Sequence, residues 1–393
     1  MRPVAITAYT LVTALGAGRA ATLEALRASR GGLVQGGFET ACLDTWLGIV
    51  DGLDAPDAGA GLGEYDCRNN RLAALGLRTD GFADQVRTVA QRVGTQRVGV
   101  FLGTSTSGIL STEIAYRHRQ ANGALPAGLH YAATHNTYSL AGYVRQALNL
   151  AGPAFVVSTA CSSSAKVFAS AARMLALGLV DAAVVGGVDT LCMTTLHGFH
   201  SLELLSTDIC RPWDARRRGL SLGEGAAFAL LERDAASPQA LLLGTGESSD
   251  GHHMSAPHPE GAGAMMAMRE ALAQSELRPG DVDYLNLHGT GTPNNDAAED
   301  KAVCSVFGRE LPCSSTKGYT GHTLGAAGGV EAAISMLALQ HDLLPAGLNC
   351  EQPDPALHAN YLRQPLQQEL SVVASNSFGF GGSNACLVFG AAR

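Results

Sequence analysis

Short apolar segments of strand length alternate along this chain with longer segments of helical pattern. The clearest predicted strands share an almost continuous run of apolar residues and cover residues 98–103, 154–160, 182–188, 282–289 and 385–390. Because strands of this kind alternate with helical segments throughout, the pattern predicts an α/β fold.

Two of the intervening segments are predicted helices. Residues 162–177 and 325–340 are rich in Ala and have narrow apolar faces that suit burial. Gly178 follows the first segment, and glycine at that place ends a helix readily. Both helices are therefore expected in the interior of the protein.

Short matches within the chain suggest an internal repeat. The strand ending in Gly103-Thr104 is matched by the one ending in Gly289-Thr290, and the helical residues Met174–Leu177 are matched by Met336–Leu339. Short Ala- and Leu-rich helices also resemble each other by chance, so duplication and coincidence both stay open.

A true duplication would divide the chain into two similar halves, residues 1–236 and 237–393. Cys161 would then open the helix of the first half, and His322 would open the matching helix of the second half. In that arrangement two reactive side chains face each other across a pseudo-two-fold axis.

The composition describes a compact protein. Of the 393 residues, 46% are hydrophobic and 16% are charged, against roughly 25% charged residues in an average soluble domain. This composition excludes long disordered segments. The 47 glycines predict tight turns and close packing of the backbone.

Charge and cysteine content exclude several classes of protein. The 27 Lys and Arg residues against 35 Asp and Glu residues give a net charge of -8, so a non-specific nucleic-acid partner is not expected. The nine cysteines include no Cys-x-x-Cys pair, which favours a reducing cytoplasm over a disulfide framework or a zinc ribbon. No apolar run approaches a membrane span, and Thr and Gly in the first eighteen residues favour a strand and turn over a signal sequence.

Cys161 lies where a predicted strand turns into a predicted helix. Amides and the macrodipole at a helix start favour a thiolate over a thiol, so we expect this position to activate a nucleophile. The alternative is a buried structural cysteine, which is the expectation for the other eight.

His288 ends another predicted strand and enters the glycine-rich turn of residues 289–293. Strand ends in α/β sheets commonly present catalytic groups, so this imidazole is a candidate for catalysis. A phosphate-binding loop is the weaker alternative, because the P-loop Lys and the dinucleotide-binding spacing are both missing.

Lys317 lies five residues before His322, which is expected at a helix start. A nearby ammonium group disfavours a second positive charge, so we expect a neutral imidazole that can donate a hydrogen bond to an oxyanion. Glu331 could hold Lys317 as an ion pair. The alternative is an ordinary surface pair.

The segment 375–384, Ser-Asn-Ser-Phe-Gly-Phe-Gly-Gly-Ser-Asn, is dense in glycine and holds two aromatic residues before a closing strand. Its exposed amides on a flexible loop suit an oxyanion hole or a gate. The alternative is a simple tight turn.

Five motifs occur together in one order: TACSSS, RPWD followed by LGEGA, HGTGTPNND, KGYTGHTLGAAGGVE and NSFGFGGSN. In this the chain resembles the elongating β-ketoacyl-acyl carrier protein synthases, decarboxylating condensing enzymes of the thiolase superfamily. The resemblance implies a thiolase-like, five-layered α-β-α-β-α fold of two similar halves, a dimer, and a Cys-His-His active site.

By this resemblance, Cys161 accepts an acyl group, and the backbone amides of Cys161 and Phe380 form the oxyanion hole. His288 and His322 hydrogen-bond the malonyl thioester and stabilise the enolate, with Lys317 and Glu331 in the same catalytic set. No metal and no organic cofactor is expected.

The resemblance also implies a gate and a substrate site. The gate loop consists of Phe378, Gly379, Phe380, Gly381 and Gly382. The substrate-binding residues are expected to be Thr106, Thr290 and Thr292.

Two positions depart from the family pattern. Glu203 stands where many elongating synthases carry an Arg for carrier-protein docking, and Arg218 stands where an Asp is usual. Substitutes to be tested for the docking role are Arg68, Arg71, Arg117 and Arg119.

The segments RNNRL, LGTSTSGI and STACSSSA resemble bacterial aryl polyene ketosynthases more than housekeeping fatty acid synthases. The expected partners are acyl carrier protein in acyl and malonyl forms, together with a second copy of the chain or a chain-length-factor homologue. Two other functions are compatible with parts of this pattern: a non-catalytic chain-length factor, and a malonyl decarboxylase or thioesterase. A cytoplasmic bacterial protein is expected.

Overall fold

One large mixed sheet organises the protein. The computed structural model describes residues 1–55, 57, 59, 61–233 and 235–392. Twelve strands join in this sheet, and two smaller sheets lie beside it. The large sheet consists of two units of five strands with the same topology, which is described next.

The first unit has the strand order β1-β9-β7-β5-β6. β9 pairs antiparallel with β1 and with β7, whereas β7, β5 and β6 run parallel. The bounds are β1 Val4–Thr13, β5 Val98–Gly103, β6 Ala154–Val157, β7 Ala182–Asp189 and β9 Gly225–Glu232.

The second unit repeats this order and these directions as β10-β17-β16-β11-β12. The bounds are β10 Ala240–Ser249, β11 Tyr284–Asn286, β12 Pro312–Ser314, β16 Val372–Gly379 and β17 Ser383–Ala391. The matched dipeptides and tetrapeptides of the sequence fall on equivalent elements or shortly after them, so the prediction of two halves with the same fold is confirmed. β9 ends at Glu232 and β10 begins at Ala240, while a division at residues 236 and 237 stays a prediction.

The units meet where β1 and β10 pair antiparallel over residues 4–6 and 240–242. Short strands complete the sheets: β2 Gly16–Ala17 and β14 Asn360–Tyr361 in the large sheet, β3 Val34–Gln35, β4 Trp46–Gly48 and β8 Leu222–Gly223 in the second, and β13 Leu343–Leu344 and β15 Leu366–Gln367 in the third.

Helices α6 (Ser163–Ala176) and α11 (Ala327–His341) form the middle layer. Each helix contacts strands of both units, and together they contribute to one buried core with β1, β7, β9, β16 and β17. In α11, Ala327 to Leu339 are all buried. A helix that is apolar on all sides is expected in the interior of a protein.

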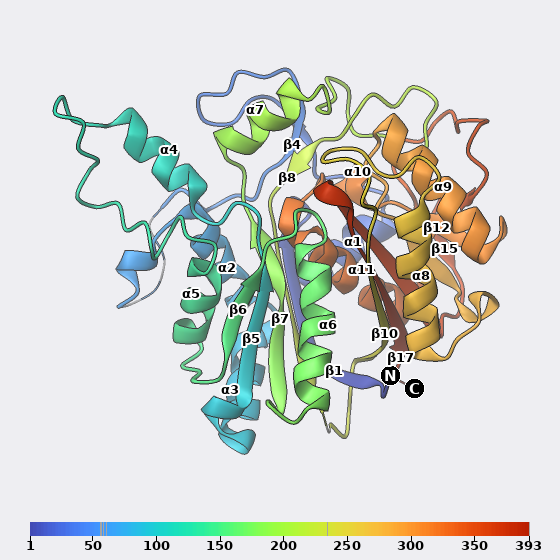
Figure 1. The fold of residues 1–393 in the computed structure, drawn as a ribbon, viewed down its shortest axis with the longest axis horizontal. Coiled ribbons are helices and arrows are strands. Elements are labelled where there is room, and N and C mark those ends of the chain that lie inside the picture. Colours follow the sequence, from blue (N-terminus) through green and yellow to red (C-terminus); the bar gives the residue numbers. More distant parts are fainter. Residues whose placement is uncertain (56, 58, 60, 234, 393) are drawn as a thin grey trace.

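Further helices cover the outer faces of the two units, as Figure 1 shows on the left and right of the molecule. The first unit carries α2 (Arg68–Arg78), α3 (Phe82–Val93) and α5 (Ser139–Ala147), and the second carries α8 (Ala262–Ser275) and α9 (Pro293–Phe307). The sequence of layers is therefore α-β-α-β-α, as predicted.

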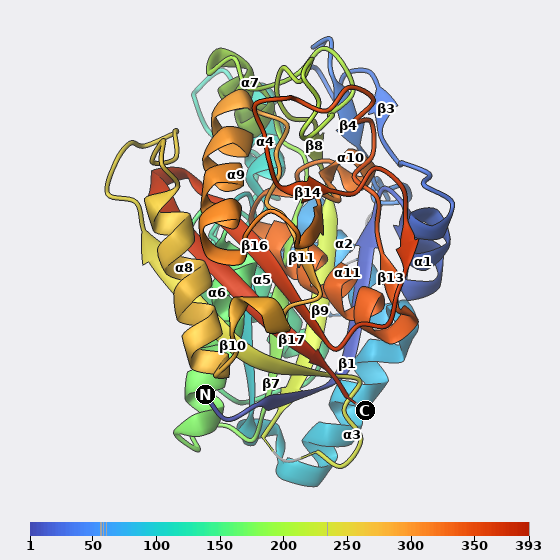
Figure 2. The same cartoon turned by 90° about the vertical axis from the view of Figure 1, so that its right-hand side faces the viewer.

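The remaining helices are α1 Arg19–Arg27, α4 Ile109–Arg117, α7 Met193–Ser201 and the one-turn α10 Lys317–Thr320. Figure 2 places α7, α9 and α10 toward the same end of the molecule, which is the end opposite the two termini. No helix in the described part of the chain combines the length and the apolar character needed to cross a membrane.

The predicted elements differ from the observed ones at the edges of the site. The strand predicted for residues 154–160 ends at Val157, because the chain turns there toward Cys161. The strand predicted for 282–289 covers only 284–286, since Gly289 turns the chain with a φ of +41°. A short 3-10 turn, η5 (Leu324–Ala326), precedes α11.

The close packing of α6 and α11 predicts the effect of a single methyl group. A Cβ at Gly328 of α11 would lie 2.7 Å from Ala165 of α6, so Gly328→Ala should destabilise the protein by about 1–3 kcal/mol through overpacking. Gly198 of α7 has open space around it, so Gly198→Ala should be neutral or stabilising by up to about 1 kcal/mol. Urea denaturation of both variants checks this, and equal midpoints would contradict the packing argument.

Candidate active site

Cys161 lies in the turn between β6 and α6, four residues beyond the last strand pair at Val157. Ala160 before it has a φ of +52°, a left-handed conformation that is rare for a residue with a side chain. The Ser163 hydroxyl donates to the Ala160 carbonyl at 2.6 Å and accepts the Thr159 N–H at 2.8 Å. These bonds hold the turn, and the thiol is buried.

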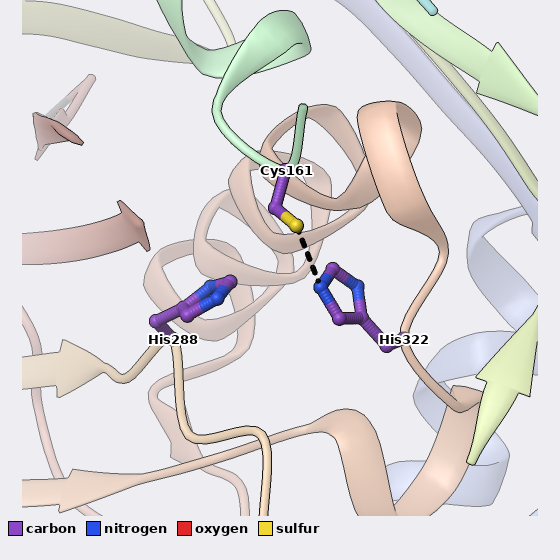
Figure 3. A group of neighbouring side chains, drawn as sticks. All are labelled: Cys161, His288 and His322. Atoms are coloured by element: carbon purple, nitrogen blue, oxygen red, sulfur yellow. Dashed lines mark hydrogen bonds between the residues drawn. The ribbon is translucent and has the colours of Figure 1, made fainter. Parts of the chain in front are cut away.

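Three side chains meet at this turn (Figure 3). His322 Nε2 lies 3.0 Å from Cys161 Sγ, and the rings of His288 and His322 stand nearly perpendicular with centroids 5.4 Å apart. The sulfur and one nitrogen of each ring all lie within 4.8 Å of one another. The predicted meeting of Cys161 and His322 from the two halves is therefore confirmed.

The hydrogen-bond partners of the two imidazoles indicate which nitrogen carries the proton. His322 Nδ1 accepts the Leu324 N–H at 3.2 Å, so a neutral ring carries its proton on Nε2, which faces Cys161. His288 Nδ1 lies 3.3 Å from Lys317 Nζ, which leaves the His288 Nε2–H free to donate. Both rings present a donor to the space beside the sulfur.

Burial is the main reason why the pKa of both His288 and His322 lies well below its ordinary value, and the charge of Lys317 lowers both further. The two imidazoles are therefore neutral at physiological pH, which the sequence predicts for His322. A neutral imidazole can donate one N–H hydrogen bond to an oxyanion, and it lacks the more acidic second proton of an imidazolium, which the anion could remove.

Lys317 lies in α10, buried behind the two histidines. Its ammonium group donates to the Glu331 carboxylate and to the His288 carbonyl oxygen. Both partners of the ion pair are almost inaccessible to solvent, so the alternative of a surface pair is wrong. Burial raises the pKa of Glu331 to about 7, and the charge and hydrogen bond of Lys317 limit this rise.

The Cys161 thiol is less acidic than its position in the sequence suggests. Burial raises the pKa of Cys161 to about 11, although the charge of Lys317 and the backbone N–H groups of Phe380 and Cys161 act in the opposite direction. The prediction that the helix start favours the thiolate is therefore wrong for the resting protein, because desolvation outweighs the amides and the charge.

The loop of residues 378–382 brings the Phe380 N–H to the Cys161 sulfur, the geometry predicted for an oxyanion hole. Gly381 and Gly382 have φ of +78° and +75°. Gly379 is extended, with a φ of -101°, and a Cβ there would lie 2.6 Å from the Thr159 carbonyl oxygen. Glycine is required at position 379 because the chain passes close to Thr159, and not because the backbone there is left-handed.

The two aromatic rings of the loop lie in different surroundings. Phe378 is buried and packs 5.7 Å from the His288 ring. The Phe380 ring is partly exposed and lies 5.4 Å from the ring of Phe199 on α7. Only Phe380 therefore has the freedom expected of a gate, and Phe199 is a partner that sequence analysis did not identify.

A pocket of about 300 Å³ opens beside the three reactive side chains and is lined in part by Cys161, His288, His322 and Phe380. The hydroxyls of Thr290 and Thr292 lie 2.9 Å apart, and both residues line this pocket.

Thr106, the third residue expected to bind substrate, is not among the residues that line this pocket. Its hydroxyl donates to the buried Asp189 carboxylate at 2.7 Å.

Glu299 of α9 supports His288 and was not identified from the sequence. Its carboxylate accepts the N–H groups of His288 at 2.8 Å and Gly289 at 2.7 Å, and the Asn376 amide at 3.1 Å. Burial raises the pKa of Glu299 to about 7. The only feature of the sequence that points to this role of Glu299 is the position of a carboxylate eleven residues after His288, in an otherwise ordinary polar helix.

In the described residues, a group of side chains that could act as metal ligands lies close together, and it consists of Cys161, His288 and His322. Cys and His are zinc ligands. The ammonium of Lys317, 3.3 Å from His288 Nδ1, opposes a second positive charge there, so the geometry suits a developing anion better than a cation.

The arginines suggested for docking have different surroundings. Arg68 is buried and pairs with Glu224 at 2.6 Å, and Arg71 pairs with Asp66 at 2.6 Å. Neither side chain is free for a partner, so these two suggestions are wrong. The other residues in question are exposed: Glu203 at the pocket mouth, and Arg117, Arg119 and Arg218.

Two family profiles match the chain in succession. The one described as Beta-ketoacyl synthase, N-terminal domain matches residues 80–237, and the one described as Beta-ketoacyl synthase, C-terminal domain matches residues 239–351.

Individual relatives agree with these profiles. The mitochondrial 3-oxoacyl-[acyl-carrier-protein] synthase of Arabidopsis thaliana is 39% identical over 269 residues, 63% of this chain but only 58% of that protein, which is less than two thirds of its length. The 3-oxoacyl-[acyl-carrier-protein] synthase 2 of Coxiella burnetii is 36% identical over 310 residues, which cover 74% of this chain and 75% of that protein.

Among solved structures, the complex of ketosynthase ApeO with its chain length factor ApeC from Xenorhabdus doucetiae contains a chain with a TM-score of 0.91 and 38% identity. The match covers 99% of this chain and 98% of that chain. The chain therefore belongs to the β-ketoacyl-acyl carrier protein synthases, condensing enzymes of the acyltransferase class with a thiolase-like fold.

Proposed function

We propose that this protein joins a malonyl unit to an acyl group held on Cys161, with loss of carbon dioxide. The observation that carries the proposal is the placement of two neutral imidazoles and two backbone N–H groups around one buried thiol. These groups provide a nucleophile and two separate places where negative charge is stabilised.

In the first step the Cys161 sulfur attacks the thioester carbonyl of an acyl carrier protein. The backbone N–H groups of Cys161 and Phe380 stabilise the tetrahedral oxyanion. The carrier thiolate then leaves and takes up the proton that Cys161 loses. Lys317 and the helix start of α6 assist the loss of this proton, since both favour negative charge on the sulfur.

In the second step malonyl-carrier protein enters the same pocket. Its thioester oxygen accepts hydrogen bonds from the Nε2–H groups of His288 and His322. When the bond to the carboxylate carbon breaks, carbon dioxide leaves, and the electron pair forms an enolate whose oxygen these two donors stabilise. Lys317 and Glu331 hold the imidazoles neutral and in place, and Thr290 and Thr292 bind the polar arm of the carrier thioester.

In the third step the enolate carbon attacks the acyl carbonyl on Cys161, and the oxyanion forms again at the same two backbone amides. Collapse of this intermediate expels the Cys161 thiolate and yields a β-ketoacyl thioester on the carrier protein. Release of carbon dioxide drives the condensation, and neither a metal nor an organic cofactor takes part.

The proposal extends to pathway and partners. The likeness to a ketosynthase in complex with its chain length factor, over 99% of the chain, supports elongation beside a chain-length-factor subunit. The aryl polyene pathway is proposed from the segments RNNRL, LGTSTSGI and STACSSSA, with fatty acid elongation as a homodimer as the alternative. The duplicated halves, residues 1–236 and 237–393, would act as one catalytic unit in a bacterial cytoplasm.

Two other functions are the alternatives to this proposal. A non-catalytic chain-length factor would not need Cys161, His288 and His322 together in hydrogen-bonding geometry. A malonyl decarboxylase or thioesterase would use the same residues, and its products distinguish it, because it releases acetyl-carrier protein or free acid and no elongated chain.

The two half-reactions should separate in variants. Cys161→Ala should acquire no acyl mass, whereas His288→Ala and His322→Ala should acquire it and lose about 100- to 1,000-fold in malonyl decarboxylation, as for removal of one oxyanion donor. Intact-protein mass spectrometry and release of labelled carbon dioxide measure the two steps. Acyl mass on Cys161→Ala at another cysteine, or normal carbon dioxide release by either histidine variant, would remove that residue from the mechanism.

Phe380 should couple the two steps as a gate. Phe380→Ala keeps the backbone amide and deletes the ring, so malonyl decarboxylation before acylation should rise toward the rate of the acylated wild type. Phe199→Ala removes the ring that Phe380 contacts and should act in the same direction. An unchanged order of the two half-reactions, followed by stopped-flow mixing, would mean that the loop is only a turn.

The raised pKa of Cys161 predicts how its reactivity depends on pH. Because the thiolate fraction increases up to a pKa of about 11, alkylation of Cys161 by iodoacetamide should accelerate about tenfold per pH unit through pH 9. Peptide mapping assigns the label to Cys161, with Cys161→Ser as the control. A plateau below pH 8 would show that the amides and Lys317 outweigh burial.

A further inference from the structure

Asp189, the last residue of β7, is a fully buried carboxylate beside the active site. None of the ion pairs in the described part of the chain involves it. A buried carboxylate without a cation must be stabilised by hydrogen-bond donors.

The donors come from two segments that lie far apart in the sequence. From the loop after β5, the hydroxyls of Thr104 and Thr106 donate to Asp189 Oδ1 at 2.6 and 2.7 Å. The Thr106 N–H donates to the same oxygen at 2.8 Å. The Ser105 N–H lies 3.0 Å from Oδ1 and 2.9 Å from Oδ2. From η5, in the other half, the Gly325 N–H donates to Oδ2 at 2.6 Å. Asp189 therefore ties the two halves together three residues from His322.

Glycine makes this contact possible. A Cβ at Gly325 would lie 2.7 Å from both Asp189 Oδ2 and the Ser105 nitrogen, far inside normal contact distance. On β7, a Cβ at Gly187 would lie 3.3 Å from Ala326 Cα. The turn before α11 can approach the end of β7 only because both positions lack a side chain.

The same turn holds the ring of His322. Leu324, one residue before Gly325, has a φ of +52°, a left-handed conformation that a leucine adopts only where its surroundings impose it. In this conformation its N–H donates to His322 Nδ1 at 3.2 Å, and His322 Nε2 faces Cys161 Sγ. The chain of contacts runs from Asp189 through Gly325 and Leu324 to the reacting sulfur.

We propose that Asp189 is a positioning residue that holds the turn of residues 323–325 so that the Leu324 N–H keeps the His322 proton on Nε2. Its effect on catalysis rests on the function proposed above, in which His322 Nε2–H stabilises the enolate. Its effect on the ring is independent of that function.

Asp189→Asn tests the role with little change in shape. The amide oxygen should take the place of Oδ1, which receives most of the donors, so the NH2 group would face the Gly325 N–H, where two donors cannot bond. The turn should loosen, and malonyl decarboxylation should fall about 10- to 100-fold, as for loss of a partner that orients an active-site ligand. The KM for malonyl-carrier protein should change far less, because Thr290 and Thr292 are untouched.

A matched control separates this effect from general destabilisation. Asp214 is also fully buried and accepts backbone N–H groups of Arg216, Glu351 and Gln352 at 2.8 Å, in addition to its ion pair with the Arg216 guanidinium at 3.2 Å. Asp214→Asn therefore weakens a comparable set of backbone contacts in another loop. It should lower thermal stability without lowering the rate of decarboxylation per folded molecule.

Nitrogen NMR of histidine-labelled protein observes the ring directly. The His322 signals, assigned by their loss in His322→Gln, should report a proton on Nε2 in the wild type and a mixture of tautomers in Asp189→Asn. In Asp189→Asn/Leu324→Gly, glycine adopts the left-handed turn without strain, so both the signals and the rate should return toward the wild type.

Unchanged His322 signals in Asp189→Asn, or a loss of rate that Leu324→Gly does not reverse, would overturn the proposal. If Asp189→Asn does not fold, Thr106→Val removes one hydroxyl donor and should shift the same signals by less, and no shift would count against the role. A wild-type protein without condensing activity would refute the proposed function, while the NMR comparison would still decide the role of Asp189.

Discussion

The packing of α6 against α11 in the middle layer is the constraint on which the active site depends. Cys161 lies two residues before α6, and His322 precedes α11 by the short turn η5, so the packing of the two helices brings the two side chains together. Gly328 and Ala165 are small enough for close approach. A thiol and an imidazole from equivalent places in a duplicated fold thereby come within 3.0 Å of each other.

Burial of charge gives this site its chemical character. Ionised groups in the interior are costly unless they are paired or fully hydrogen-bonded, and the charged groups here satisfy that condition. Lys317 has Glu331, while Glu299 and Asp189 accept N–H and O–H donors. The buried Lys317 ammonium lowers the pKa of both histidines and favours negative charge on the sulfur. The site is therefore prepared for anions that form during reaction, and the resting protein keeps a neutral thiol and two neutral imidazoles.

Much of the architecture could be predicted from the sequence. Apolar runs located β5, β7 and β17, and the Ala-rich segments located α6 and α11 to within one or two residues. These predictions succeed because periodicity and glycine placement are local properties. Predictions failed where the chain turns toward the site, at the ends of β6 and β11, because side chains outside the apolar runs, such as Ser163 and Glu299, accept the N–H groups of the turns.

For the site, the sequence by itself determined which groups are present, and it placed Cys161 and His322 at matching helix starts only on the condition that the chain is duplicated. Only the tertiary structure decided their properties. It placed Arg68 in the interior, turned the Thr106 hydroxyl to Asp189, and raised the pKa of Cys161 above its usual value. Each outcome depends on how much solvent the neighbouring layers exclude and on which donors they bring close. The burial of a side chain and the identity of its hydrogen-bond partners depend on residues far apart in the chain, so no local sequence pattern predicts them.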